Sequence, residues 1–148
     1  MAERIIVRQN SQFITEFLAP SPENLESADV QPVMHIHGLT PYGMLLAGLG
    51  SCTAIVLHTY AQHHKIDLQS VEIHLAYDRV FLEDCENCET IQKYEEQITE
   101  GILLEGHFTE DQHDKLLKIA HQCPIQKILE NNTEVKSSLL EEEDKKNR

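Results

Sequence analysis

The sequence has no tryptophan, few aromatic residues and far fewer bases than acids. Twelve Lys and Arg stand against 25 Asp and Glu, which gives a formal net charge of -13. A chain with this charge is repelled by phosphate backbones and anionic membranes unless a local basic patch overrides the total. The one adjacent basic pair, Lys145-Lys146, lies beside the acids of residues 141–144. We therefore expect neither nucleic acid nor a membrane surface as a partner.

The amino terminus lacks the apolar run of a secretory signal. Residues 1–10, MAERIIVRQN, carry charges where such a signal needs an apolar stretch of about 7–15 residues. We therefore expect a cytoplasmic protein with mostly reduced cysteines. Cysteines spaced as Cys52, Cys85, Cys88 and Cys123 then indicate catalysis, redox sensing or metal binding more often than a disulfide framework. A free buried cysteine is the alternative for each of them.

Charged side chains are also missing from residues 30–64, which predicts a largely buried segment. Thr40 is a suitable helix cap, and Pro41 suits the first turn. Small residues around Cys52 would allow another backbone or helix to approach closely. A membrane span of about 20 residues is the alternative, but polar interruptions and the lack of a basic flank argue against it. The apolar positions that recur at helical spacing are Tyr42, Leu45, Leu46, Leu49, Thr53, Val56, Leu57 and Tyr60.

The remaining pattern predicts short strands and two further helices in an α+β protein. A length of 148 residues suits one domain, which we place at residues 1–140, followed by a charged tail at 141–148 that we expect to be disordered. Period-two alternation is clearest from Val71 to Tyr77. The strands are predicted at residues 4–7, 13–18, 33–37, 71–77, 94–104 and 135–140, and the helices after the cap Thr109 and from Cys123 to Glu130.

Two cysteines differ in their local chemistry. Cys123 precedes Pro124 at a predicted helix start, where the helix dipole and free backbone N–H groups favour a thiolate. Cys52 lies in the middle of an apolar helix, where burial would raise its pKa. From the residues alone, Cys123 is the better redox candidate, and both cysteines also fit purely structural roles.

The other residues that could bind a metal ion do not form a complete metal site. Cys85 and Cys88 make a Cys-x-x-Cys pair flanked by acids, without the four ligands of a structural zinc site. A local disulfide, a half-site completed across a dimer and a surface pair without function all remain open. His35 and His37 would share one face of a strand, but without a third ligand nearby ordinary hydrogen-bonded histidines are the better explanation. We expect no metal and no cofactor.

Two segments together resemble the OsmC-like family. They are LTPYGMLLAGLGSCTAIVLHTYAQHHKID, which contains Cys52, and IAHQCPIQKILENN, which contains Cys123. The loop DCENCE at residues 84–89 is similar to the insertion of a subgroup often described as redox proteins. The resemblance extends from about His35 to Leu140.

This resemblance implies a fold and a chemistry. The implied fold is an intertwined homodimer in which antiparallel sheets wrap around long central helices. The implied activity is that of a cysteine-based peroxidase, with peroxiredoxin-type chemistry, in oxidative stress defence. Cys52 would attack a small hydroperoxide, Cys123 would resolve the sulfenic acid as a disulfide, and a dithiol reductant would reset the pair.

The sequence departs from that family pattern at the start of the cysteine helix. Peroxidase members carry a carboxylate there that holds an arginine over the thiolate, whereas this chain has Tyr42 and Gly43. His35 or His37 could replace the missing partner. The alternative function is therefore a non-enzymatic ligand-binding or redox-sensing protein on the same scaffold.

Overall fold

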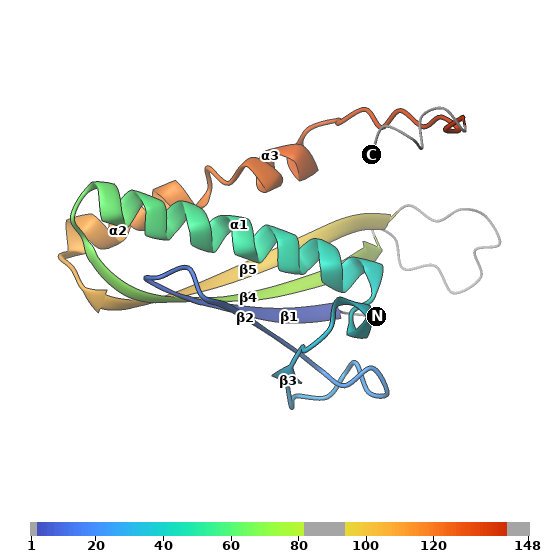
Figure 1. Cartoon of the computed structure of the whole chain (residues 1–148), viewed down its shortest axis with the longest axis horizontal. Helices are drawn as coiled ribbons and strands as arrows, with labels where there is room; N and C mark the ends of the chain where they lie inside the picture. The colour runs from blue at the N-terminus through green and yellow to red at the C-terminus, as the bar shows by residue number, and fades with distance from the viewer. Residues whose placement is uncertain (1–2, 82–93, 142–148) are drawn as a thin grey trace.

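A five-stranded antiparallel sheet with one long helix across it forms the centre of the protein (Figure 1). The computed structural model describes residues 3–81 and 94–141. The strand order across the sheet is β3-β2-β1-β4-β5. The strands are β1 (Glu3–Asn10), β2 (Thr15–Ala19), β3 (Gln31–Pro32), β4 (Asp67–Phe81) and β5 (Tyr94–His107). The predicted strand positions at 4–7, 13–18, 71–77 and 94–104 are thus confirmed.

The two central strands supply the sheet side of the core. In β1 and β4, alternate side chains point to one face, as the period-two pattern of β4 predicts. Val7 pairs with Ile73 and Ile5 with Leu75, and all four side chains are buried. The residues that alternate with these buried ones point to the other face; Arg8, which follows Val7, is exposed there.

Helix α1 (Pro41–His63) lies on the buried face of the sheet. The Thr40 hydroxyl accepts a hydrogen bond from the Gly43 N–H at 3.1 Å, which confirms the predicted cap. Near the middle of the helix the backbone comes very close to the sheet. A Cβ at Gly50 would lie 2.6 Å from Val7 Cγ2 and 2.7 Å from Leu75 Cδ1. Only glycine allows this approach without displacement of its neighbours.

Helix α1 is also long and apolar enough to cross a membrane, judged by length and composition alone. Its most apolar window is 50% buried inside the protein. The core helix of a water-soluble domain has the same properties. Its packing on β1 and β4 accounts for its apolar residues here.

Two shorter helices complete the fold at one end and along one side of α1 (Figure 1). Helix α2 (Glu110–Ala120) begins with a capping box, in which Thr109 and Gln112 bond each other's backbone N–H groups. Leu116 and Ala120 are buried in the core. Helix α3 (Pro124–Glu130) has Cys123 as its N-cap. Both predicted helix starts are confirmed.

The prediction of a strand at Val33–His37 is wrong. The edge strand β3 ends at Pro32, and the chain then forms the short 3-10 helix η1 (Ile36–Gly38). The Val33 N–H donates the last hydrogen bond of the sheet here, to the Phe17 carbonyl at 2.8 Å. Beyond it, the Gly38 N–H donates to the His35 carbonyl within the turn. These turn bonds take the backbone groups that a longer strand would need.

The prediction of a strand at Val135–Leu140 is also wrong. Residues 133–141 have no regular structure, and none of the strands within the described residues 3–81 and 94–141 pairs with them. Their apolar side chains are exposed, with Val135 at 84% and Leu139 at 97%. A strand cannot form without a neighbour that satisfies its backbone hydrogen bonds.

Candidate functional site

The structure brings Cys52 and Cys123 together, although they lie on different helices. Cys52 is near the middle of α1 and is partly buried, and Cys123 is fully buried at the start of α3. The two thiols lie near enough for Cys123 to influence the pKa of Cys52, and the backbone of Ile125 influences it as well.

The surroundings of Cys52 raise its pKa above the ordinary thiol value. Burial is the largest cause, and the hydrogen bond with Cys123 comes next. The Ile125 backbone bond lowers the pKa in part, whereas the negative charge of Glu100 raises it. Cys52 is therefore mostly a protonated thiol at neutral pH in this chain.

The described arginines are all engaged away from Cys52. Arg4 donates to the Ser27 carbonyl, Arg8 donates to Glu72 at 2.8 Å, and Arg79 donates to the Tyr77 hydroxyl at 3.3 Å. A guanidinium that would stabilise the thiolate is thus not supplied by Arg4, Arg8 or Arg79.

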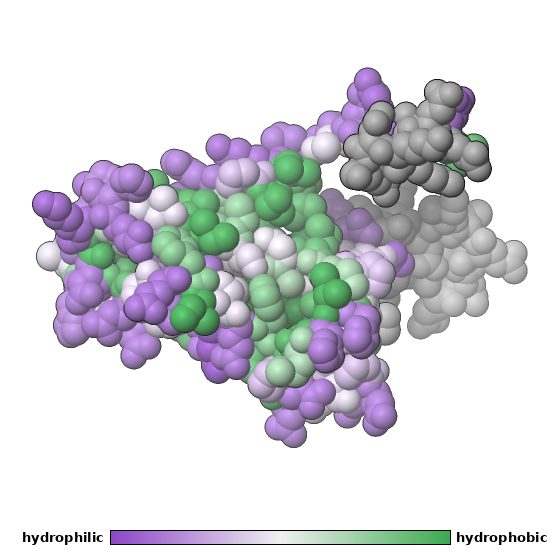
Figure 2. Space-filling view, in the orientation of Figure 1, coloured by the Kyte–Doolittle hydropathy of each residue, from purple (hydrophilic) through white to green (hydrophobic). Residues whose placement is uncertain are grey.

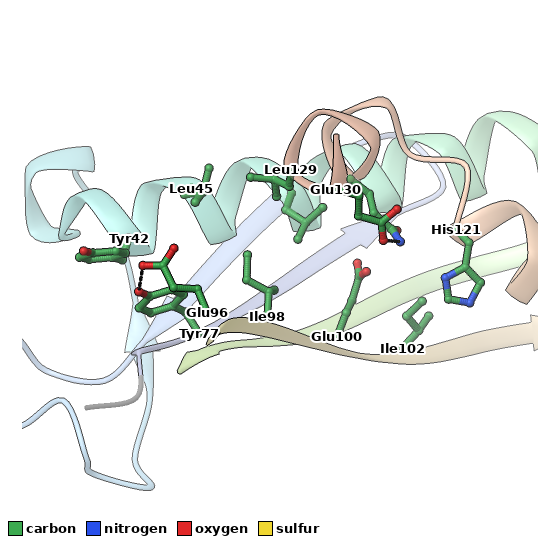
Figure 3. Close-up of a pocket in the computed structure, with 12 residues that line it drawn as sticks. Tyr42, Leu45, Tyr77, Glu96, Ile98, Glu100, Ile102, His121, Leu129 and Glu130 are labelled. Atoms are coloured by element: carbon green, nitrogen blue, oxygen red, sulfur yellow. Dashed lines mark hydrogen bonds between the residues drawn. The ribbon is translucent and has the colours of Figure 1, made fainter. Parts of the chain in front are cut away.

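Glu100 is the charged group that the structure adds to this pair. It extends from β5 toward the helices, beside Thr53 on α1 and His121 after α2 (Figure 3). Burial raises the pKa of Glu100, while the nearby Thr53 hydroxyl and the charge of His121 lower it in part. Its Oε1 atom is buried and has no hydrogen-bond partner among the described residues.

A cavity of about 550 Å³ opens next to these residues, between α1, α3 and β5. Its walls are mainly apolar, and its polar groups lie at its two ends (Figure 3). Tyr42 stacks on Tyr77 at one end, with ring centroids 4.7 Å apart, and Glu100 and His121 lie at the other. The apolar residues that line the cavity are Leu45, Leu49, Ile98, Ile102 and Leu129. Leu45 and Leu49 share the helix face of Cys52, because steps of three and four residues stay on one side of a helix.

A comparison with models of protein families identifies the family of this chain. The family model described as OsmC, OsmC-like protein, matches residues 34–138. This range contains both cysteines and more than half of the chain. The chain belongs to the OsmC-like family.

A solved OsmC-like structure has the same fold. It is the crystal structure of an OsmC-like hydroperoxide resistance protein from Jannaschia sp. CCS1, at 1.70 Å resolution. The TM-score is 0.59 with 13% sequence identity, and 95% of each chain is covered. This likeness confirms the α+β OsmC-like fold of the chain. A search of curated proteins found no match.

The helix start of this OsmC-like chain receives a carboxylate from another element. Glu3 on β1 is buried and accepts a hydrogen bond from the Thr40 hydroxyl. The predicted replacements, His35 and His37, stack on each other with ring centroids 5.3 Å apart and do not act on the Cys52 thiol. Glu3 thus fixes the cap of α1, whereas the charge beside Cys52 comes from Glu100.

Cys85 and Cys88 lie outside the residues that the structure describes. A local disulfide, a half-site completed across a dimer and a surface pair without function therefore remain the alternatives for them. Within residues 3–81 and 94–141, no group of three or more His, Cys, Asp or Glu side chains could hold a metal ion. The His35–His37 pair is therefore a stacked pair without a third ligand in this part of the chain.

The sequence interpretation missed Glu100, although a signal for it exists. Ile98, Glu100, Ile102 and Leu104 alternate with more exposed residues along β5. A glutamate at an inward position between two isoleucines is unusual, because burying a carboxylate is costly. That position alone would have marked Glu100 as a candidate.

Proposed function

We propose that this OsmC-like protein is a thiol-dependent peroxidase that reduces small hydroperoxides in the cytoplasm, as part of oxidative stress defence. Cys52 is the nucleophile and Cys123 is the resolving cysteine. The observation that carries the proposal is that Cys123 acts on the pKa of Cys52 across two helices, in a fold that also has a mainly apolar cavity of about 550 Å³. The similar protein from Jannaschia sp. CCS1, described as a hydroperoxide resistance protein, supports the same class of substrate.

The proposed reaction has three steps. The Cys52 thiolate attacks the outer oxygen of the hydroperoxide, the O–O bond breaks, and the products are an alcohol and a Cys52 sulfenic acid. The Cys123 sulfur then attacks the Cys52 sulfur and releases water, which leaves a disulfide. A dithiol reductant finally reduces this disulfide by thiol–disulfide exchange.

The cavity suits a hydroperoxide that carries an apolar group. The end with Glu100 and His121 is polar, and the charge of Glu100 influences Cys52, whereas Leu45, Ile98 and Leu129 line the space beyond it. A ligand with one polar end and one apolar end would place its hydroperoxide near the thiol. A small apolar group would fill the rest of the space.

We also propose that the working form is an intertwined homodimer. Met44, Gly48, Ser51 and Ile55 follow each other at steps of three and four residues on an exposed side of α1. Figure 2 shows apolar side chains gathered over the middle of this face of the molecule, with polar side chains around them. A second α1 helix would fit along this stripe, because its central residues are small.

The carboxyl-terminal segment supports the same assembly. Val135, Leu139 and Leu140 are exposed in a segment that pairs with no strand in the described part of its own chain. A partner sheet could supply both the backbone hydrogen bonds and the apolar contacts that this segment lacks.

A redox-sensing or ligand-binding protein is the second candidate. The observation in its favour is the raised pKa of Cys52, since a thiol without a nearby stabilising cation attacks peroxides slowly. In that function the cavity would hold an apolar ligand without turnover. Ligand-dependent thermal stabilisation without peroxide consumption would support it.

The decisive experiment measures peroxide consumption and maps the disulfide that results. Reduced protein is treated with cumene hydroperoxide and digested without reduction, and the cross-linked peptides are identified by mass spectrometry. We expect consumption of the peroxide and a Cys52–Cys123 link. Absence of both would reject the peroxidase and leave the second candidate.

Three variants make the result specific to the two cysteines. Cys85→Ser with Cys88→Ser removes the other thiols of the chain and is expected to leave the link intact. In that background, C52S should lose activity by about 100-fold or more, because it removes the nucleophile. C123S should stop after one turnover at a sulfenic acid that dimedone traps on Cys52.

A further inference from the structure

Two oxygen atoms of the cavity between α1, α3 and β5 are buried without a hydrogen-bond donor. The Glu100 side chain rises from β5 toward Glu130 on α3, with His121 beside it (Figure 3). The Oε1 atom of Glu100 has no hydrogen-bond partner among the described residues. The same is true of the Oε1 atom of Gln126, which lines the same cavity. Buried acceptors without donors are costly, so this end of the cavity suits a ligand that donates hydrogen bonds.

The orientation of the Gln126 side chain is fixed by Glu130. Gln126 Nε2 donates a hydrogen bond to Glu130 Oε1 at 2.9 Å. Rotation of the amide by half a turn would place its oxygen against the carboxylate, so the unpartnered oxygen stays an acceptor. The acceptors of Glu100, Gln126 and Glu130 thus belong to one end of the cavity. A primary ammonium group has three donors and no acceptor, which matches this set.

The charge of the cavity lining also favours a cation. Among the described residues that line it, three are glutamates, Glu96, Glu100 and Glu130, and none is Lys or Arg. At the far end, Glu96 has a cation of its own, since Arg79 Nε lies 3.9 Å from its carboxylate. Beside Glu100, the charge of His121 acts at a distance and leaves the Oε1 atom without a donor. A positively charged ligand is therefore complementary to the end with Glu100.

The rest of the cavity suits an apolar group. Leu45, Ile98 and Leu129 are among its walls, and the stacked rings of Tyr42 and Tyr77 lie at the far end, 4.7 Å apart. The volume of about 550 Å³ is in the range that small organic ligands occupy. A ligand that fills it would have one cationic end and one apolar end.

We propose that this cavity binds an apolar primary amine in its ammonium form, with the ammonium group held by Glu100, Gln126 and Glu130. The inference goes beyond the proposed peroxidase and does not depend on it, because neither Cys52 nor Cys123 lines the cavity. An amine bound there would exclude a hydroperoxide from the same space.

The test is isothermal titration calorimetry of the reduced full chain at neutral pH with three probes that share one carbon skeleton. These are phenylbutylamine, phenylbutanol and phenylbutyrate. The amine carries a proton at this pH, as a Lys side chain does. We expect it to bind about tenfold or more tightly than the alcohol, since hydrogen bonds from a charged donor are stronger, and the carboxylate to bind most weakly. Equal affinity of amine and alcohol, or binding of no probe, would overturn the proposal.

Glu100→Gln should remove most of the preference for the amine. It keeps the shape of the side chain and removes its charge, so the amine should bind about tenfold more weakly and the alcohol as before. Glu105→Gln is the matched control, because it removes the same charge from an exposed position of the same strand. It should change neither affinity. Equal weakening by both variants would mean that the amine is attracted only by the net charge of the chain, against the proposal.

A second variant decides the matter if Glu100→Gln loses the alcohol as well, which would indicate a distorted cavity. Glu130 is exposed on α3, so Glu130→Gln should leave the fold and the alcohol affinity intact. The amine should still bind several-fold more weakly to it. An unchanged amine affinity in E130Q would then overturn the proposal.

Failure of the inference and failure of the proposed function look different. Amine binding is measured without peroxide, and peroxide consumption is measured without amine. A chain that consumes peroxide but shows no preference for the amine is a peroxidase without the proposed amine site. A chain that prefers the amine but consumes no peroxide has the site, and the proposed peroxidase function is then wrong.

Discussion

Gly48 and Gly50 lie two residues apart on α1, yet they have opposite surroundings. A Cβ at Gly50 would meet Val7 Cγ2 at 2.6 Å and Leu75 Cδ1 at 2.7 Å, whereas a Cβ at Gly48 would meet nothing within 4 Å. The first glycine is required by the fold of the subunit. The second is not required by any contact in the described residues.

This difference shows that one helix carries three separate surfaces. The side with Gly50 packs on the sheet and stabilises the subunit. The side with Leu45 and Leu49 lines the cavity, and Cys52 follows them at helical spacing and lies near the second cysteine. The side with Gly48 and Ile55 is exposed. Its small and apolar residues would be buried only if another molecule bound to this side.

Among substitutions that test the difference between Gly48 and Gly50, Gly50→Leu should have the largest effect. The new side chain would collide with Val7 and Leu75 in a packed core, so we expect a loss of about 3 kcal/mol or more in the free energy of unfolding, at the upper end for overpacking. Urea unfolding followed by circular dichroism measures it. A variant as stable as the parent would show that α1 does not lie this close to the sheet.

Gly48→Leu is the matched substitution on the exposed side. The subunit should keep its fold, since the site is open and leucine favours a helix over glycine by roughly 0.8 kcal/mol. The proposed dimer should weaken by about 2 kcal/mol, on the order of thirtyfold in Kd, because two new side chains meet between the helices. Sedimentation equilibrium measures this change. An unchanged association constant would place the dimer contact elsewhere.

The smallest effect concerns His58, which is buried on the sheet side of α1. Its Nε2 lies 3.0 Å from the Gln9 carbonyl oxygen, and burial lowers its pKa below the ordinary value of 6.5. The unfolded chain therefore takes up the proton first as the pH falls. Stability attributable to His58 should be complete above about pH 6.5 and decline below it, by at most about 1.4 kcal/mol per pH unit.

His58→Gln should remove this part of the pH dependence. Urea unfolding at a series of pH values between 7.5 and 5 compares it with the parent. His63→Gln, at an exposed position of the same helix, is the control and should keep the parent's profile. Equal slopes in all three proteins would show that His58 is not buried as a neutral ring.

Local sequence signals predicted most of the secondary structure. The cap Thr40, the capping box at Thr109 and the Cys123-Pro124 junction each marked a helix start correctly, because caps depend on a few neighbouring residues. The two wrong strands, at Val33–His37 and Val135–Leu140, depend on a neighbour instead. Whether an extended segment finds one is not encoded locally.

The candidate site was predicted only in part. The pairing of Cys52 with Cys123 came from the family resemblance, and the structure places their thiols near each other. The predicted effect of burial on the Cys52 pKa has the right direction. Glu100 was missed, although its inward position between Ile98 and Ile102 could have been read from the alternation of β5.

The sequence by itself determined a long uncharged helix with a cysteine at its centre, a second cysteine at a helix start, and the strands with regular alternation. These features depend on residues close together in the chain. The tertiary structure decided which groups surround Cys52, because Glu100 and Cys123 reach it from residues 48 and 71 positions away in the chain. It also decided that Gly50 is enclosed and Gly48 is open, since only the position of the sheet distinguishes two glycines on one helix.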